Sequence, residues 1–381
     1  MDMHIWEIYN KNKISLEITQ ELREEIKSKI NNNIYRISSE IKIHPSRLYD
    51  YFFYKTLPIP LKVLMDLFDM FDIPLSKMEK EITMYKQLHV PSKNSIIKPK
   101  LPLKSNPYLT SIVANLFFDG SVPKDGRGTY YNQKNPKIMN DFINKIKYVF
   151  GDVYYSIKTD HRGVLKCRMP RIVGEICKRI YDINSFGSFD SKLPKIIFNL
   201  DEEHKMSFVI TAILDEGSIS YDGNIMFGVS NKPMCEDVRN LCNILKLNPG
   251  NVKRKSDTNH YYFHIKSKDK LMGILEFMNK KYPLISLHYK EDRLRYYFKI
   301  KKNIVRHTQE FGNQRKYRII QSISRKPKTV NHLAKELLIP PRSLRRHLIN
   351  LQKQGKVKNI KKGNENVYFT AHLSKAALSS L

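Results

Sequence analysis

The 381-residue sequence has few cysteines, a single tryptophan and no long apolar run. Its cysteines form no Cys-X-X-Cys pair, which argues against a zinc or disulfide framework and favours buried reduced thiols; they are Cys167, Cys177, Cys235 and Cys242. The longest apolar run, FVITAIL, is far too short to span a bilayer, and the start MDMHIWEIYN lacks the basic-then-apolar layout of a secretory signal. We therefore expect a cytoplasmic protein with no membrane segment.

Acidic residues are scarce as well, since 37 Asp and Glu stand against 67 Lys and Arg, a formal net charge of +30. The imbalance is uneven: residues 301–381 hold nineteen Lys and Arg against three Glu, a balance of +16. Lysine richness also follows from an AT-rich genome, but this concentration indicates a surface for a polyanion, and nucleic acid is the usual one. The chain length and a hydrophobic content of 41% allow two or three globular domains with their own cores.

Residues 1–90 are expected to be helical throughout and to contain a helix-turn-helix. In NIYRISSEIKIHPSRLYDYF, one helix face carries Ile34, Ile37 and Ile41. A short Lys-Ile-His turn follows, and Pro45 restarts a helix at a position that suits proline. The segment resembles helical DNA-binding domains of the repressor type, with 45–53 as the recognition helix and Arg47 and Tyr49 as candidate DNA contacts. A helical hairpin used only for packing is the alternative.

Residues 310–381 predict a second DNA-binding unit, a winged helix over about 310–371. Three helices are marked by apolar stripes, which are Ile319, Ile320 and Ile323, then Leu333 and Leu337, then Leu344, Leu348 and Leu351. The third helix begins at Pro341 and stops at Gly355, and KVKNIKKGNENVYFT follows as two short strands around a Gly-Asn turn. The pattern resembles winged helices of archaeal and bacterial regulators. Candidate DNA contacts are Arg342, Arg345 and Arg346 on the third helix, with Lys358, Lys361 and Lys362 on the wing. A solvated basic face that packs on the rest of the protein is the alternative.

Between these units, the basic, proline-punctuated segment 91–107 predicts an extended linker, and the segment 108–302 repeats itself. From Asp119, a polar strand and turn lead to an amphipathic helix that closes at a glycine 32 residues later. From Glu216 the same order recurs, with the glycine 34 residues later. Each half then continues with two strands and a helix. The simplest account is a duplicated αββαββα unit, with halves of about 108–190 and 191–302.

The strands of the repeat alternate as expected for sheets with one covered face. In VLKCRMP, the apolar side is Leu165, Cys167 and Met169, and the opposite side is Lys166 and Arg168. In NHYYFHIKSK, the apolar side is Tyr261, Phe263 and Ile265, and the opposite side is His260, Tyr262, His264, Lys266 and Lys268. The exposed face is therefore basic, as a surface against a duplex would be. Metal binding by His260 and His264 is a weaker interpretation, because the sequence offers no third ligand.

Two acids occupy an unusual place in this repeat. LTSIVANLFFDG predicts a helix that ends at Gly120, and FVITAILDEG predicts a buried helix. Each helix brings a carboxylate, Asp119 or Glu216, to its own C-terminus, where the helix dipole disfavours an anion. Folding gives no reason for this placement, whereas a divalent cation such as Mg²⁺ would offset the repulsion and activate a water for attack on a phosphodiester.

The segments IVANLFFDG (112–120) and VITAILDEG (209–217) resemble the nine-residue motif of the LAGLIDADG homing endonucleases, and the likeness in strand and helix order covers about 105–302. The resemblance implies an α+β protein with a pseudo-symmetric duplicated core, flanked here by all-α helix-turn-helix and winged-helix domains. It implies that the two motif helices form the seam and that the sheets form a saddle over double-stranded DNA.

The resemblance further implies that Asp119 and Glu216 bind Mg²⁺ and cut opposite strands, and that the protein acts as a monomer on DNA. In this family, basic residues near the end of the last strand in each half often assist catalysis. The matching positions here are Lys166 or Arg168 and Lys266 or Lys268. The chain departs from the family at motif position seven, usually a small residue, where it has Phe118 and Asp215.

Three functions are compatible with these features. The first is a Mg²⁺-dependent, site-specific DNA endonuclease. The second is a non-catalytic transcription regulator, because the same fold joined to a helix-turn-helix domain also resembles the sporulation regulators of the WhiA type. The third is an RNA-binding maturase of the same fold. The retained acids favour the nuclease, while Phe118 and the two extra DNA-binding units favour the regulator.

Overall fold

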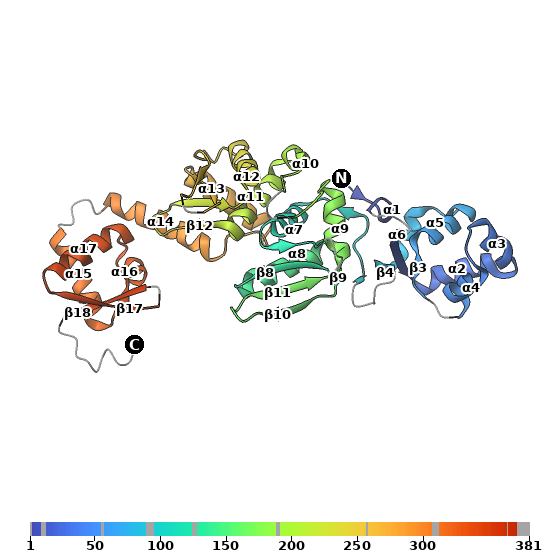
Figure 1. Cartoon of the computed structure of the whole chain (residues 1–381), viewed down its shortest axis with the longest axis horizontal. Helices are drawn as coiled ribbons and strands as arrows, with labels where there is room; N and C mark the ends of the chain where they lie inside the picture. The colour runs from blue at the N-terminus through green and yellow to red at the C-terminus, as the bar shows by residue number, and fades with distance from the viewer. Residues whose placement is uncertain are drawn as a thin grey trace.

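The computed structural model describes residues 2–8, 13–54, 57–88, 95–123, 128–187, 191–256, 258–306, 312–363 and 365–371, with the backbone alone for residues 2, 301–306 and 312–313. The fold is α+β with antiparallel sheets. The molecule is elongated: the N-terminal segment lies at one end, the C-terminal segment at the other, and the two repeats lie between them (Figure 1). Within the described residues, no helix combines the length and apolar character needed to cross a bilayer.

The first repeat has the predicted αββαββα order. Its elements are α7 (Pro107–Phe117), β7 (Gly120–Ser121), β8 (Thr129–Gln133), α8 (Pro136–Phe150), β10 (Ser156–Thr159), β11 (Leu165–Met169) and α9 (Arg171–Ile180). The strands form one sheet in the order β10-β11-β8-β7. Asn106 and Asn135 cap the starts of α7 and α8, and a proline follows each at the first helical position, which fixes where both helices begin.

The second repeat has the same elements in the same order. They are α11 (Glu202–Glu216), β12 (Gly217–Ile219), β13 (Ile225–Val229), α12 (Lys232–Ile244), β14 (Lys253–Arg254), β15 (Tyr261–Ile265) and α13 (Lys268–Lys281), preceded by α10 (Lys195–Asn199). The sheet order β14-β15-β13-β12 matches that of the first repeat strand for strand. The predicted duplication is therefore confirmed.

The N-terminal segment differs from the all-helical prediction. The predicted helices α3 (Ile34–Glu40) and α4 (Pro45–Tyr49) are present, together with α1 (Ile5–Ile8), α2 (Gln20–Ile30), the 3-10 turn η2 (Asn31–Asn33), the π-helical turn η3 (Asp50–Tyr54), α5 (Leu61–Met70) and α6 (Leu75–Glu81). They pack with β2 (Ile14–Ile18), β3 (Ile59–Pro60) and β4 (Ile82–Gln87), which are strands. The segments ISLEI and ITMYKQ are short, and no second strand pattern lies next to either of them in the sequence. Only their pairing in the folded sheet identifies them as strands.

The expected linker 91–107 is also partly structured. Residues 89–94 lie outside the described part, but β5 (Ser95–Ile97) pairs with β4 on one side and with β9 (Asp152–Val153) of the first repeat on the other. The short strand β6 (Leu103–Lys104) pairs with β1 (Asp2–Met3). The N-terminal segment and the first repeat thus share a five-stranded sheet, β3-β2-β4-β5-β9, and a single apolar core.

The C-terminal segment has the three helices and the hairpin predicted for it. They are α15 (Gly312–Arg325), α16 (Val330–Leu337), α17 (Pro341–Lys353), β17 (Val357–Lys362) and β18 (Glu365–Thr370), with β16 (Lys328–Thr329) as the third strand of the sheet. Its stripe residues form a separate apolar core. The expected core boundary at residue 302 falls inside a helix, because α14 (Tyr289–Arg306) leads from the second repeat toward this segment.

Candidate functional site

The two motif helices, α7 and α11, lie side by side in the middle of the molecule (Figure 1), and every residue of α7 is buried. Glu216 is the last residue of α11, whereas α7 ends at Phe117, so Asp119 lies in the turn just beyond the helix instead of within it. The glycine after each acid is required by space. A Cβ on Gly120 would stand 2.6 Å from the Cα of Leu116, and one on Gly217 would stand 2.6 Å from the Ile213 carbonyl oxygen.

The two acids interact electrostatically. Burial raises the pKa of Asp119 to about 6, and the positive charge of Lys290 opposes this rise. Burial also raises the pKa of Glu216 to about 7, the negative charge of Asp119 adds to the rise, and Lys290 again opposes it. Both carboxyls are therefore hard to ionise without a cation close by.

The two residues at motif position seven each reach into the opposite repeat. The Asp215 carboxylate accepts hydrogen bonds from Asn115 Nδ2 at 2.8 Å and from the Tyr131 hydroxyl at 2.9 Å. Burial, followed by the charge of Asp119, raises the pKa of Asp215 above its usual range. The ring of Phe118 packs edge-on against Phe208 and Phe227 of the second repeat, with ring centroids 5.9 and 5.7 Å apart. With Phe118 in this place, the charge of Asp119 still acts on Glu216.

A buried lysine of the first repeat belongs to the same polar network. Lys145 of α8 is 3% exposed and donates to Ser111 Oγ and to Asn115 Oδ1, both at 2.7 Å. Ser111 Oγ in turn lies 2.8 Å from Thr211 Oγ1 on α11. Burial lowers the pKa of the Lys145 ammonium to about 8, against the pull of Asp215. The contact between α7 and α11 near the two acids is therefore stabilised by charged and polar groups as well as by apolar packing.

A second buried lysine lies at the end of α11 itself. Lys290, in the first turn of α14, is 5% exposed. Its Nζ donates to the carbonyl oxygens of Leu214 at 2.5 Å, Gly217 at 2.6 Å and Ile213 at 3.0 Å. Burial lowers its pKa to about 8, while the negative charges of Asp215, Asp119 and Glu216 raise it. Lys290 is thus the basic group that acts on both acids.

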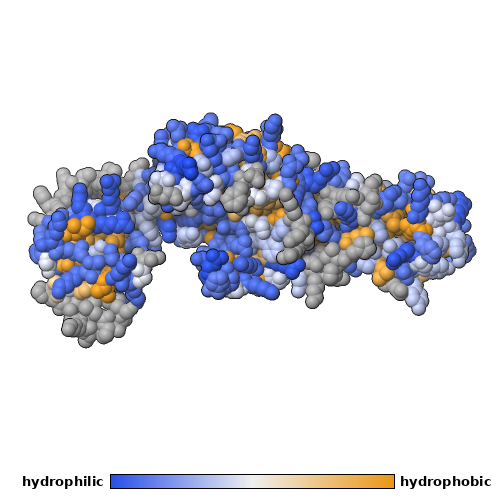
Figure 2. All heavy atoms as spheres, viewed as in Figure 1, coloured by the Kyte–Doolittle hydropathy of each residue, from blue (hydrophilic) through white to orange (hydrophobic). Residues whose placement is uncertain are grey.

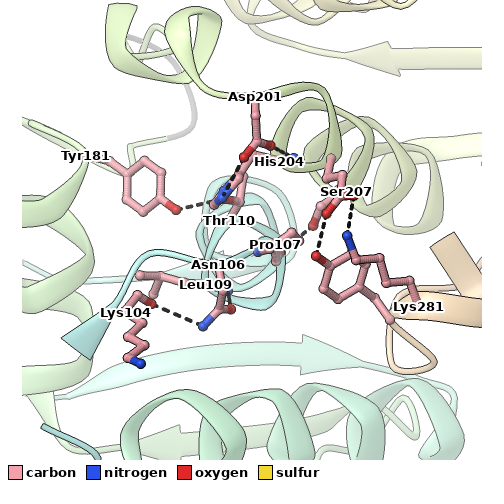
Figure 3. A network of polar contacts seen from close by, with 12 residues as sticks. Lys104, Asn106, Pro107, Leu109, Thr110, Tyr181, Asp201, His204, Ser207 and Lys281 are labelled. Carbon is pink, nitrogen blue, oxygen red and sulfur yellow. Dashed lines mark hydrogen bonds and ion pairs between the residues drawn. The ribbon is translucent and has the colours of Figure 1, made fainter. Parts of the chain in front are cut away.

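The opposite end of the seam is polar too (Figure 3). Thr110 Oγ1 lies 2.7 Å from the Tyr181 hydroxyl and 2.6 Å from His204 Nδ1, and Ser207 Oγ donates to the Pro107 carbonyl at 2.5 Å. The Asp201 carboxylate caps the first turn of α11 at the His204 amide. These contacts fix the register of α7 against α11, and so fix where each helix delivers its acid.

The sheet of the first repeat exposes its predicted basic residues. Lys166 and Arg168 are exposed on β11 while Cys167 and Met169 are buried, as the alternation predicts. Lys166 pairs with Asp160 at 3.6 Å. Hydrophilic side chains gather over β10 and β11 on the face seen in Figure 2.

The second repeat differs at one predicted residue. Lys266 is exposed directly after β15. Lys268, predicted on the strand face, instead begins α13, and its Nζ lies 4.2 Å from the centre of the Tyr297 ring. The strand ends at Ile265, so the alternation cannot be extended to residue 268.

The candidate contacts in the terminal segments are exposed. Arg47 and Tyr49 are exposed on α4, and Arg342, Arg345 and Arg346 are exposed on α17 away from the buried leucines. On the hairpin, Lys358, Lys361 and Lys362 are exposed as well. Exposure is what contact with DNA requires, although a solvated basic face also has it.

The cysteine and histidine side chains considered as metal ligands do not come together in a metal site within the described residues. The four cysteines are free and buried. His260 and His264 have no third ligand beside them, and within the described residues no three His, Cys, Asp or Glu side chains cluster as metal ligands. A Mg²⁺ ion needs only one or two carboxylates when waters and phosphate oxygens complete its shell, so Asp119 and Glu216 fit it as a donor set.

Two lysines of this site were missed from the sequence. Lys145 left a signal, because it lies three residues after Phe142 and four before Val149, on the apolar face of its helix. A lysine on an apolar stripe indicates a buried partner. Lys290 left none, since it is one of many lysines in a polar helix and its partners are 73 to 77 residues away.

No protein-family model matches the chain, and no curated protein matches its sequence. Similar solved structures are full-length DUF199/WhiA from Thermatoga maritima and the homing endonuclease I-DmoI in complex with DNA and Mn. The first shares 14% identity at a TM-score of 0.33, covering 67% of this chain and 93% of that one. The second shares 12% identity at a TM-score of 0.32, covering 45% of this chain and 94% of that one. TM-scores this low do not support a functional argument.

Proposed function

We propose that the chain is a site-specific, double-stranded DNA endonuclease of the LAGLIDADG type that acts as a monomer with Mg²⁺. The observation that carries the proposal is the duplicated acid at the end of two paired helices. Asp119 and Glu216 stand at equivalent positions of the two repeats, and each costs free energy to ionise where it lies. A function for the charged forms explains why both acids are present.

Asp119 and Glu216 would hold Mg²⁺, which supplies Lewis-acid stabilisation of the phosphate and an activated water when bound. The remaining work belongs to the chain. The Asp215, Asn115 and Lys145 network beneath the acids holds the two helices in register. Lys166, exposed on β11, and Lys266, exposed directly after β15, are the proposed assisting basic residues. Arg168 and Lys268 are proposed DNA contacts, and Lys268 is the less favoured because it lies on α13.

The terminal segments would add DNA contact on either side of the repeats. In the winged-helix arrangement proposed for 310–371, α17 would enter a major groove with Arg342, Arg345 and Arg346, while Lys361 and Lys362 would meet phosphates. Arg47 on α4 would make the corresponding contact at the N-terminal end. The +16 balance of residues 301–381 supports this assignment.

A cleavage assay on genomic DNA with Mg²⁺ tests the nuclease. We expect wild type to produce discrete double-strand breaks and Asp119→Asn or Glu216→Gln to lower the rate about a hundredfold or more, because each removes a metal ligand. Asp269→Asn, an exposed acid on α13, is the matched control and should cut like wild type. Tight specific binding without cleavage under any divalent ion would contradict the nuclease.

The second candidate function is a non-catalytic, DNA-binding regulator of the same fold. Lys290 favours it, because an ammonium that already offsets the charge of the acids makes a metal less necessary for folding. Specific binding upstream of a gene that survives a change of both acids to Ala would select this function over the nuclease.

A further inference from the structure

The surroundings of Lys290 are those of a cation site. Its Nζ lies 2.5 to 3.0 Å from three main-chain carbonyl oxygens at the end of α11, and the charges of Asp119, Asp215 and Glu216 act on it. Carbonyl and carboxylate oxygens are the ligands that hard divalent ions take. Here three carbonyl oxygens contact an ammonium that the chain itself provides, and the nearby carboxylates act on it through their charge.

The corresponding end of α7 is closed in a different way. The Asp119 carbonyl accepts hydrogen bonds from the Asn132 amide at 3.0 Å and from Asn132 Nδ2 at 3.2 Å, and the Ala114 carbonyl accepts from the Phe118 amide. Both helices thus end with a main-chain amide on a carbonyl, since the Gly217 amide donates to Ile213, but α11 has a charged donor, Lys290, in addition. The repeats are alike in backbone, but their acids stand in unequal electrostatic environments.

The position of Lys290 also excludes a purely solvated role. Lysine is rarely buried without partners, because its ammonium loses a strong hydration shell. At 5% exposure, the three carbonyls replace that shell, and they lie at a helix C-terminus, where positive charge is favoured. The side chain reaches this place from α14, outside both αββαββα units.

We propose that the Lys290 ammonium occupies, at the end of α11, the place that one divalent ion would otherwise take next to Asp119 and Glu216. Lys290 is thus a positioning residue for this acid pair. With Lys290 in place, the site binds one divalent ion fewer than the same two acids and helix ends would bind if the lysine were absent. The proposal rests on the assignment of Asp119 and Glu216 as metal ligands, but not on cleavage.

Counting bound Mn²⁺ by electron paramagnetic resonance tests the proposal on the full chain. Lys290→Ala removes the ammonium and leaves room for an ion with its waters, so we expect about one more Mn²⁺ per chain than in wild type. Lys290→Arg keeps the charge and should bind as many ions as wild type. Lys299→Ala, an exposed lysine on the same helix, is the matched control and should not change the count.

Equal Mn²⁺ counts in wild type and Lys290→Ala would overturn the proposal. If Lys290→Ala is too unstable to count, its thermal unfolding decides: the proposal expects Mn²⁺ to raise its Tm more than that of wild type, and an equal or smaller rise overturns it. Failure of the nuclease is separate. It would appear as absence of cleavage by wild type, whatever the difference in Mn²⁺ count.

Discussion

At the scale of single residues, the acids at the end of α7 and α11 are the least favourable groups for folding in the seam. Folding raises the pKa of Asp119 to about 6 and of Glu216 to about 7, because partial burial disfavours both charged forms and, for Glu216, the negative charge of Asp119 adds to the rise. A carboxyl whose pKa is raised by folding binds protons more tightly in the folded state. Stability is therefore highest below the unfolded pKa values and falls as pH rises through the folded ones.

We accordingly expect the double variant Asp119→Asn, Glu216→Gln to be more stable than wild type at about pH 8 in the presence of a metal chelator. The free energy of unfolding should rise by on the order of 2 kcal/mol. The gain should vanish at about pH 3.5, where the carboxyls are protonated in both folded and unfolded chains. Urea unfolding at the two pH values measures this, and Asp269→Asn serves as the control. A double variant less stable than wild type at about pH 8 would show that the acids stabilise the fold.

At the scale of elements, α7 and α11 are joined by a charged network whose members come from three helices and a strand. Asp215 belongs to the second repeat, whereas Asn115, Tyr131 and Lys145 belong to the first. When one member is removed, the others stay buried without their partners. The network therefore specifies that these two halves pair with each other in this register.

We expect Lys145→Met to lower the free energy of unfolding by about 3 kcal/mol, because it removes a cation that offsets the Asp215 charge and leaves the buried Ser111 and Asn115 oxygens without their donor. The added change Asp215→Asn should restore part of this loss, since it removes the uncompensated charge. Chemical denaturation of both single variants and the double variant gives the coupling energy. Strictly additive losses would mean that the two groups do not interact.

At the scale of the whole molecule, the two terminal segments are attached differently. The N-terminal segment continues into the first repeat through the β4-β5-β9 pairing and shares its core. The C-terminal segment has a core of its own, and the partly buried Tyr296 of α14 packs against it from outside the segment. A contact between Lys335 and the ring of Tyr221, at 5.4 Å, also joins it to the second repeat.

A fragment of residues 312–371 is therefore expected to unfold cooperatively by itself, because its apolar core is complete within those residues. A chain lacking residues 1–88 is expected to lose its cooperative transition, because β5 then loses its pairing with β4 and the shared core loses one side. Circular dichroism during heating measures both. A truncated chain that melts at the temperature of wild type would show that the N-terminal segment is an independent domain.

Local patterns in the sequence were sufficient for much of this architecture. Helix stripes and strand alternation predicted the elements of both repeats and of the C-terminal segment, because each pattern is a property of a few neighbouring residues. They failed for β2, β4 and β5, whose strands are defined by their partners. A shared sheet and α14 extend across the positions 90 and 302 at which domain boundaries were expected, and no local pattern shows this either.

The sequence by itself determined the duplication and the two acids, each followed by a glycine, whereas the close backbone contacts that require these glycines appear only in the structure. Only the tertiary structure decided what surrounds the acids: Lys145 beneath the seam, Lys290 at the end of α11, and Phe118 turned into the opposite repeat. Periodicity acts over a few residues, whereas the contacts of Lys290 join positions more than seventy residues apart. Such contacts depend on how the repeats pack, and no local pattern encodes them.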